Sequence, residues 1–159
     1  MDPCSGCDAG CCSRFFVPLT CRDVKALMGC GLPLADAVGW IEVGSVFCSF
    51  PDVRLGDGYC YMVLKRREDG LCVLASSQEG GFRCGLHGKH PLLCRLYPRT
   101  LHGELCRSNL CRNVQPPADA SLLESGLKAL GEYEDKVARW NTSKRAGRLP
   151  EDFIRFLLA

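Results

Sequence analysis

The chain has 159 residues, of which 47% are apolar and 24% are charged, and its formal net charge is +2. This length fits one domain, and the apolar content is enough for a modest core, which excludes a disordered tail. Thirteen cysteines dominate the composition, and their odd number leaves one unpaired even if disulfides formed. Eight thiolates on two divalent ions would change the net charge to about −2, so charge gives no argument for nucleic-acid binding.

The N-terminal residues predict an intracellular location. Asp2 follows Met1 where a secretion signal would carry basic residues, and no apolar segment with a cleavage site comes next. The longest mainly apolar stretch, 26–51, is interrupted by Asp36 and Glu42 and does not fit a membrane-spanning helix. We therefore expect a cytoplasmic protein without a membrane partner. In that compartment thiols stay reduced, and a dense set of cysteines binds metal more often than it forms disulfides.

The chain begins with four closely spaced cysteines, Cys4, Cys7, Cys11 and Cys12. Two cysteines separated by two residues can turn back onto one tetrahedral metal ion, so Cys4 and Cys7 form a competent half-site. Cys11 and Cys12 are adjacent, and in an extended segment their side chains would point to opposite sides. Either one of them is spare, or the segment lies between two metals or across a polynuclear cluster. We favour the second interpretation, because the thiols outnumber the ligands of one site.

One helix and one hairpin are predicted next. The helix is expected to start at Thr20, which forms a capping-box pattern with Asp23, and to end near Gly29. The segments 59–64 and 71–74 are strand-like, and the polar, glycine-containing sequence between them predicts a hairpin turn.

The C-terminal third is predicted to be helical. Ser121 and Glu124 form a capping-box pattern at the start of a long helix that runs to about Thr142. One apolar face of this helix is expected to consist of Leu123, Leu127, Leu130, Val137 and Trp140. Pro150 is expected to open a short final helix that docks on the core. The docking residues are expected to be Phe153, Phe156 and Leu157.

Further metal ligands are expected downstream of the first four cysteines. They are Cys72, Cys84, Cys94, Cys106 and Cys111. Cys94 is predicted to lie on a short helix opened by Pro91. Arginines stand next to four of these cysteines in sequence, and such neighbours favour the thiolate form and offset the charge of a metal–thiolate centre. All-sulfur ligation suits both zinc and iron–sulfur clusters, so we expect zinc or iron as the cofactor, and more than one metal ion.

These motifs resemble those of the CxxCxxCC, or YkgJ-like, cysteine-cluster family over residues 4–98. The family's closing element is matched by Cys84, Leu86, Pro91, Cys94, Arg95, Tyr97 and Pro98. Cys72 fits the element before it, and Cys60 competes for that place but lies further from Cys84. The resemblance implies a zinc- or iron-chelating domain. The chain departs from the pattern in having three residues between Cys7 and Cys11, and in carrying His87 and His90, two candidate imidazole ligands, where the family has Tyr and Arg.

The fold predicted from these features is a small, loop-rich, metal-stabilised α+β domain with a β-hairpin region and C-terminal helices. We expect a cysteine-cluster region at 4–113 and a helical extension at 119–159 that packs on it.

Metal binding is the function that the ligand density favours, with metal ions as the partners. One alternative is a metal- or iron–sulfur-dependent enzyme related to the flagellin lysine N-methylases, an analogy that comes from the family resemblance. The sequence has no dinucleotide, phosphate-loop or zinc-protease motif, which weighs against it. Another alternative is a zinc-ribbon-like interaction module, although the charge pattern does not suit nucleic acid. The sequence identifies no protein partner.

Overall fold

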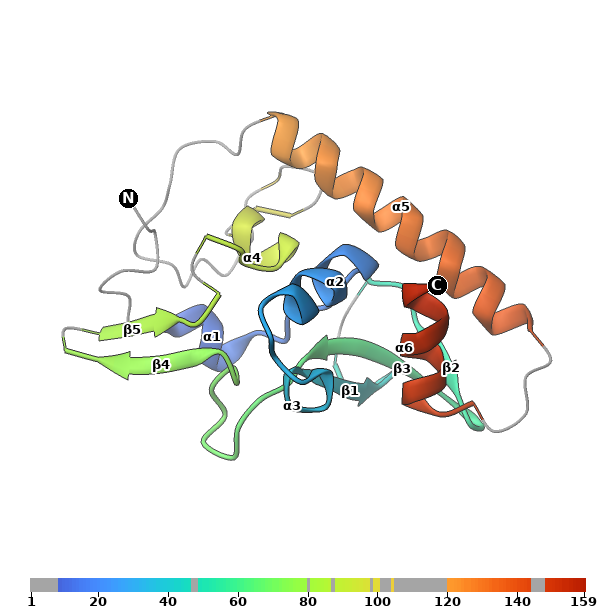
Figure 1. The fold of residues 1–159 in the computed structure, drawn as a ribbon, viewed down its shortest axis with the longest axis horizontal. Coiled ribbons are helices and arrows are strands. Elements are labelled where there is room, and N and C mark those ends of the chain that lie inside the picture. The colour runs from blue at the N-terminus through green and yellow to red at the C-terminus, as the bar shows by residue number, and fades with distance from the viewer. Residues whose placement is uncertain are drawn as a thin grey trace.

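The computed structural model describes residues 9–46, 49–79, 81–86, 88–97, 99–100, 104, 120–143 and 148–159. Within them the chain has an α+β fold, which confirms the predicted class (Figure 1). The helices are α1 (Gly10–Arg14), α2 (Cys21–Gly29), α3 (Leu34–Ala37), α4 (Leu92–Leu96), α5 (Ala120–Thr142) and α6 (Pro150–Leu158). The strands are β1 (Val38–Glu42), β2 (Val53–Leu55), β3 (Gly58–Leu64), β4 (Ala75–Gln78) and β5 (Gly81–Cys84).

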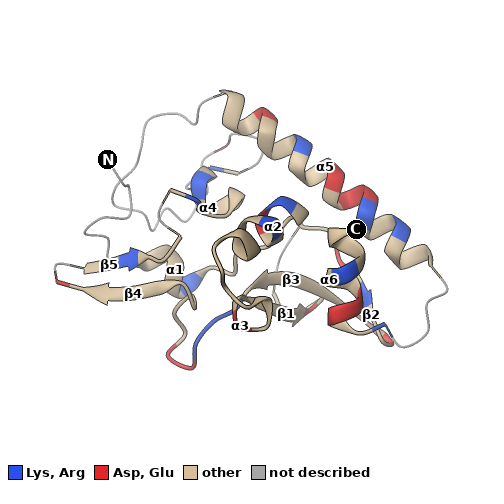
Figure 2. Cartoon of the chain, in the orientation of Figure 1, with Lys and Arg blue, Asp and Glu red and all other residues tan. Residues whose placement is uncertain are grey.

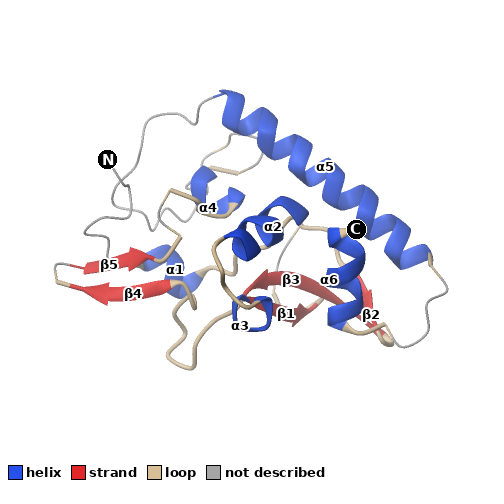
Figure 3. Cartoon of the chain, viewed as in Figure 1, coloured by secondary structure: helices blue, strands red, loops and turns tan. Residues whose placement is uncertain are grey.

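The strands form two separate antiparallel sheets (Figure 3). The larger sheet has the order β1-β3-β2, with Val38 opposite Leu64, and the smaller one is the β4-β5 hairpin. On the side of β3 away from β1, the N–H of Leu19 donates to the carbonyl of Met62 at 3.0 Å, and the N–H of Leu64 donates to the carbonyl of Val17 at 2.9 Å. These bonds fix the segment between α1 and α2 against the central strand.

The predicted hairpin between 59–64 and 71–74 is correct at its turn, where 65–67 bond to 71–73, but wrong in the partners of 59–64. Residues 59–64 belong to β3, whose partners are β1 and β2. The last four residues of β3 are buried, as expected of a strand that is covered on both faces. The polar turn itself does form, because the N–H of Arg67 donates to the carbonyl of Leu71 at 2.8 Å. It joins only short segments, and the chain then enters β4, which pairs with β5.

The predicted helix after Thr20 is confirmed as α2, and its cap also organises α4. Both bonds of the capping box are present, with Asp23 Oδ2 accepting from the Thr20 N–H at 2.8 Å. The second carboxylate oxygen, Oδ1, accepts from the N–H of Leu92 at 2.8 Å. Leu92 is the first residue of α4, which follows Pro91 as predicted. One buried carboxylate therefore fixes the starts of two helices.

Helix α5 ends at Thr142 as predicted but begins at Ala120, so Ser121 lies inside the helix and is not its cap. The buried residues of α5 are Gly126, Ala129, Tyr133, Val137 and Trp140. The predicted apolar face is thus correct at Val137 and Trp140 but wrong at Leu127, which is 45% exposed. Leu127 is rotated about 100° around the helix axis from Gly126 and so turns away from the core.

The main core lies where α5 and α6 meet α2 and the larger sheet. The predicted docking of the final helix is confirmed, since Phe153 and Leu157 are fully buried and Phe156 packs against the same cluster. The Trp140 ring meets Phe153 edge-on, with centroids 5.4 Å apart. The Trp140 Nε1–H donates to the carbonyl of Arg54 at 2.8 Å, so its polar atom is satisfied on β2.

Charged side chains of both signs follow one another along the exposed part of α5 (Figure 2). One of them, Glu132, forms a two-point ion pair with Arg22 of α2, with N–O distances of 2.6 and 3.0 Å. This pair ties the long helix to the α2 layer. In the described part of the chain, no helix is both long enough and apolar enough to cross a membrane.

Candidate metal centre

A cavity of about 900 Å³ is lined by five of the nine predicted cysteine ligands. Cys11 and Cys12 come from α1, Cys72 from the turn that follows β3, Cys84 from the end of β5, and Cys94 from α4. These four segments are widely separated in the sequence. The fold thus brings the described part of the predicted ligand set to one place.

The thiols are close enough to alter one another's acidity. A hydrogen bond with Cys11 raises the pKa of Cys12, and burial and the charges of Cys11, Cys72 and Cys94 raise it further. Burial also raises the pKa of Cys94 well above its usual value, and Cys72, Cys84 and Cys11 add to that effect. Such repulsion between nearby thiolates is relieved by a cation bound among them.

Cys72 is held directly against the cysteines of α1. Its backbone N–H donates to the carbonyl of Cys12 at 2.9 Å, and its side chain is buried. Burial raises the pKa of the Cys72 thiol, and the positive charge of Arg66 opposes that rise. A fixed cation beside a buried thiol lowers the free energy of the thiolate, the form that binds metal.

The premise that Cys11 and Cys12 lie in an extended segment is wrong. Both belong to α1, a single helical turn. Adjacent side chains on a helix differ by about 100° in direction and are not opposed, so the two thiols can face one cavity. Both cysteines line the cavity, so the local geometry does not exclude either of them as a ligand.

Cys60 and Cys72 both fit one position of the sequence motif, and the structure places only Cys72 at the cavity. Cys60 lies on β3 opposite Glu42 and Val53, and it is absent from the described residues that line the cavity. Burial, together with the charge of Glu42, raises the pKa of Cys60. Cys72 is the one that lies with the other thiols.

Other predicted ligands differ in how far the structure describes them. His90 lines the cavity, and its Nε2 atom is buried. The remaining candidates lie outside the described residues, and these are Cys4, Cys7, His87, Cys106 and Cys111.

The donor chemistry of the cavity fits zinc or iron better than it fits hard cations. Sulfur ligands favour soft or borderline metals, whereas magnesium and calcium prefer oxygen. The described residues contain no group of three Cys, His, Asp or Glu side chains already arranged to hold a metal ion. Zinc–sulfur bonds are about 2.3 Å long, so the described thiols would have to move closer together to share one ion.

Two polar residues that organise the site were missed or only partly found from sequence. The sequence predicts Asp23 as the capping-box partner of Thr20, but its bond to Leu92 of α4 joins segments far apart in sequence, and no local pattern predicts it. Arg66 was not identified at all, since its contacts to α1 exist only in the folded chain. The aromatic contact between Phe15 and Tyr97 at the cavity wall, with centroids 5.4 Å apart, was likewise not predicted.

Comparison with known proteins adds no assignment. No protein-family model, curated protein or solved structure matches the chain. The function of the site is therefore inferred from its own residues.

Proposed function

We propose that the protein binds zinc or iron through a cluster of cysteine thiolates, with iron held as an iron–sulfur cluster. The observation that carries this proposal is the meeting of thiols from four distant segments in one cavity. These thiols are Cys11, Cys12, Cys72, Cys84 and Cys94. Cysteines used only as small apolar residues have no reason to converge, whereas metal ligands must.

The complete centre would draw on more cysteines than the structure describes. Cys4, Cys7, Cys106 and Cys111 are the further ligands expected from the sequence. Nine thiols exceed the four that one tetrahedral zinc ion takes, so the proposal includes more than one metal ion or a polynuclear cluster. In the reducing cytoplasm cysteines do not form disulfides and stay available as thiolate ligands. We therefore propose a cytoplasmic location.

Metal binding is proposed to stabilise the fold as well. Every residue of α1 is described and none of them is fully buried, and only the half-buried Cys12 packs against the core, so apolar burial holds this helix weakly. Coordination of Cys11 and Cys12 would strengthen the attachment of α1, and its free energy would then be part of the free energy of folding.

Three positions of the family motif support a distant relationship to the CxxCxxCC proteins. Cys72, Cys84 and Cys94 match the motif in sequence, and all three line the same cavity. We include membership of that family in the proposal on this basis.

A metal-dependent enzyme is a second candidate, favoured by the size of the cavity. A volume of about 900 Å³ is far larger than one metal ion and lies within the usual range of small-molecule sites. Its walls include apolar side chains from several segments of the chain, among them Phe15, Phe50 and Leu130. An organic substrate bound there would lie beside the metal. A change in the absorption of the bound metal on adding a small organic ligand would favour this candidate over a purely structural centre.

The proposal is tested by replacing one cavity thiol and one thiol outside the cavity. Cys94→Ser should lower the amount of metal that co-purifies with the protein and make the chain more sensitive to protease. Cys60→Ser, on β3, should leave the metal content unchanged. Metal analysis by mass spectrometry measures both. Equal metal retention in the two variants would contradict the ligand assignment.

A further inference from the structure

We propose that Arg66 is a positioning residue that holds α1 against the Cys72 turn and so determines whether Cys11 and Cys12 join the metal ligands. The inference rests on the proposed metal-binding function. It concerns how the ligand set is assembled, and it assigns a role to a residue that is not itself a ligand.

The attachment of α1 depends on polar contacts. The helix has five residues, all described and none fully buried, and of these only the half-buried Cys12 packs against the main core. Its last residues are followed by an extended segment that leads to the edge of β3. One half-buried side chain fixes a helix only weakly, so we infer that polar contacts also set the position of its two cysteines.

Arg66 provides that contact by capping the end of α1. Its Nη1 donates to the carbonyl of Ser13 at 2.7 Å, and its Nη2 donates to the carbonyl of Phe15. The last carbonyls of a helix lack partners within the helix, and an arginine can satisfy several of them. The guanidinium also lies over the Phe16 ring, 4.5 Å from its centroid. One side chain thus contacts three residues at and just after the end of α1, which are Ser13, Phe15 and Phe16.

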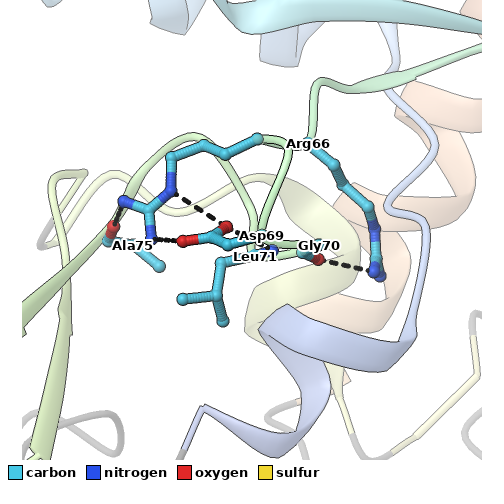
Figure 4. A network of polar contacts seen from close by, with 6 residues as sticks. Arg66, Asp69, Gly70, Leu71 and Ala75 are labelled. Carbon is cyan, nitrogen blue, oxygen red and sulfur yellow. Dashed lines mark hydrogen bonds and ion pairs between the residues drawn. The ribbon is translucent and has the colours of Figure 1, made fainter.

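The same side chain is fixed to the turn that carries Cys72. Nη1 of Arg66 also donates to the carbonyl of Gly70 at 2.8 Å, across the turn (Figure 4). In the backbone, Arg66 pairs with Cys72 in an isolated bridge, and the Cys72 N–H reaches the carbonyl of Cys12 at 2.9 Å. Arg66 therefore joins two thiol-bearing segments, and its positive charge lies where a metal–thiolate centre would be negative.

The neighbouring Arg67 offers a matched control. Its guanidinium bonds to Asp69 at 2.8 and 3.3 Å and to the carbonyl of Ala75 at 2.8 Å. Figure 4 shows Arg66 at one side of the turn and Ala75 at the other, with Asp69 between them. Arg67 thus braces the same turn from the side away from α1, and its ion pair with Asp69 is partly exposed.

The experiment uses the full chain with zinc for affinity and cobalt(II) as a spectroscopic probe. Arg66→Met should raise the zinc dissociation constant about 10- to 100-fold, the effect typical of residues that orient metal ligands. It should also weaken the sulfur-to-cobalt charge-transfer absorption, because fewer thiolates remain bound. Arg66→Lys keeps the charge but lacks the planar fork, so we expect its absorption to stay low while its affinity recovers in part. Arg67→Met should change neither readout.

Several results would overturn the inference. Parent-like affinity and absorption in Arg66→Met would show that α1 is positioned without Arg66. Full recovery of both readouts in Arg66→Lys would show that charge alone matters, and an equal loss in Arg67→Met would show that the turn matters only for general stability. If Arg66→Met does not fold by circular dichroism, the comparison of Arg66→Lys with Arg67→Met decides the question. If the parent protein binds neither zinc nor cobalt, the proposed function fails and this inference fails with it. If the parent binds metal and the Arg66 variants bind it with the same affinity and absorption, only the role of Arg66 is refuted.

Discussion

Replacing Asp23 should reveal how much the shared helix cap contributes to stability. The carboxylate is buried and accepts from the Thr20 N–H and hydroxyl at 2.8 and 2.7 Å through Oδ2, and from the Leu92 N–H at 2.8 Å through Oδ1. In Asp23→Ala, the Thr20 N–H and hydroxyl lose their acceptor in the capping box, while Thr20 remains the N-cap, and we expect a cost of about 1 kcal/mol. The buried Leu92 N–H also loses its acceptor, which adds about 2 kcal/mol.

Asp23→Ala is therefore expected to lower the free energy of unfolding by about 3 kcal/mol, which is large for a domain whose total stability is about 5–15 kcal/mol. It corresponds to a fall in melting temperature of about 10 °C for a chain of this size. Asp23→Asn is the matched control, because its remaining carbonyl oxygen can still accept from Leu92. Its amide nitrogen takes the place of Oδ2 and cannot accept from the Thr20 N–H. We therefore expect the free energy of unfolding to fall by about 1 kcal/mol.

Urea unfolding of the three proteins at one fixed zinc concentration measures these differences, since bound metal shifts the apparent stability. Asp23→Ala should also retain less metal than Asp23→Asn, because Leu92 begins the helix that carries Cys94. An equal loss in the two variants would refute the claim that the bond to Leu92 contributes. A loss under about 0.5 kcal/mol in both would refute the reasoning on the cap as a whole.

Three further predictions follow from the described contacts. The hydrogen bond from Arg22 lowers the pKa of Glu132, so this ion pair stabilises the fold above the ordinary glutamate pKa and stops doing so as the pH falls through the lowered value. The difference in unfolding midpoint between the parent and Glu132→Gln should therefore shrink on acidification, and a constant difference would contradict this. Ala129→Glu should destabilise the protein by about 3 kcal/mol or more, because it places a charge at a buried position, whereas Leu127→Glu on the exposed side should cost about 0.5 kcal/mol or less in thermal or urea unfolding. Zinc binding should release protons, because buried thiols such as Cys72 have a raised pKa and must lose a proton to coordinate. Calorimetry in buffers of different ionisation enthalpy measures that release, and a heat that is independent of buffer would contradict it.

Local patterns predicted those elements whose determinants are close together in sequence. Helix α2 was found because Thr20 and Asp23 cap it three residues apart. Helix α6 was found because proline opens it and aromatic residues follow at helical spacing. The start of α5 was misplaced because the sequence Ser121–Glu124 imitates a cap within the helix.

The partners of β3 could not be predicted in the same way. Its own residues are strand-like, but β1 and β2 are short and lie in glycine-containing sequence with weak periodicity. A strand pair depends on which segments meet in the folded chain, so the adjacent polar turn suggested the wrong partner.

In the candidate site, too, local sequence patterns identified some residues, and others depend on contacts between distant segments. Cys72, Cys84 and Cys94 were selected by spacing, and they do line one cavity. The contribution of Arg66 was not predictable, because a pair of arginines after a strand gives no sign of which one will reach α1. Ligand types can be read from the sequence, whereas the residues that position them depend on contacts between distant segments.

The central claim is that the clustered thiols hold metal, and the metal content of protein purified without oxygen tests it most directly. We expect zinc or iron bound to the chain. Zinc would give a colourless sample, whereas an iron–sulfur cluster would give visible charge-transfer absorption together with acid-labile sulfide. Protein that contains no metal on purification and takes up neither added zinc nor added iron would contradict the account.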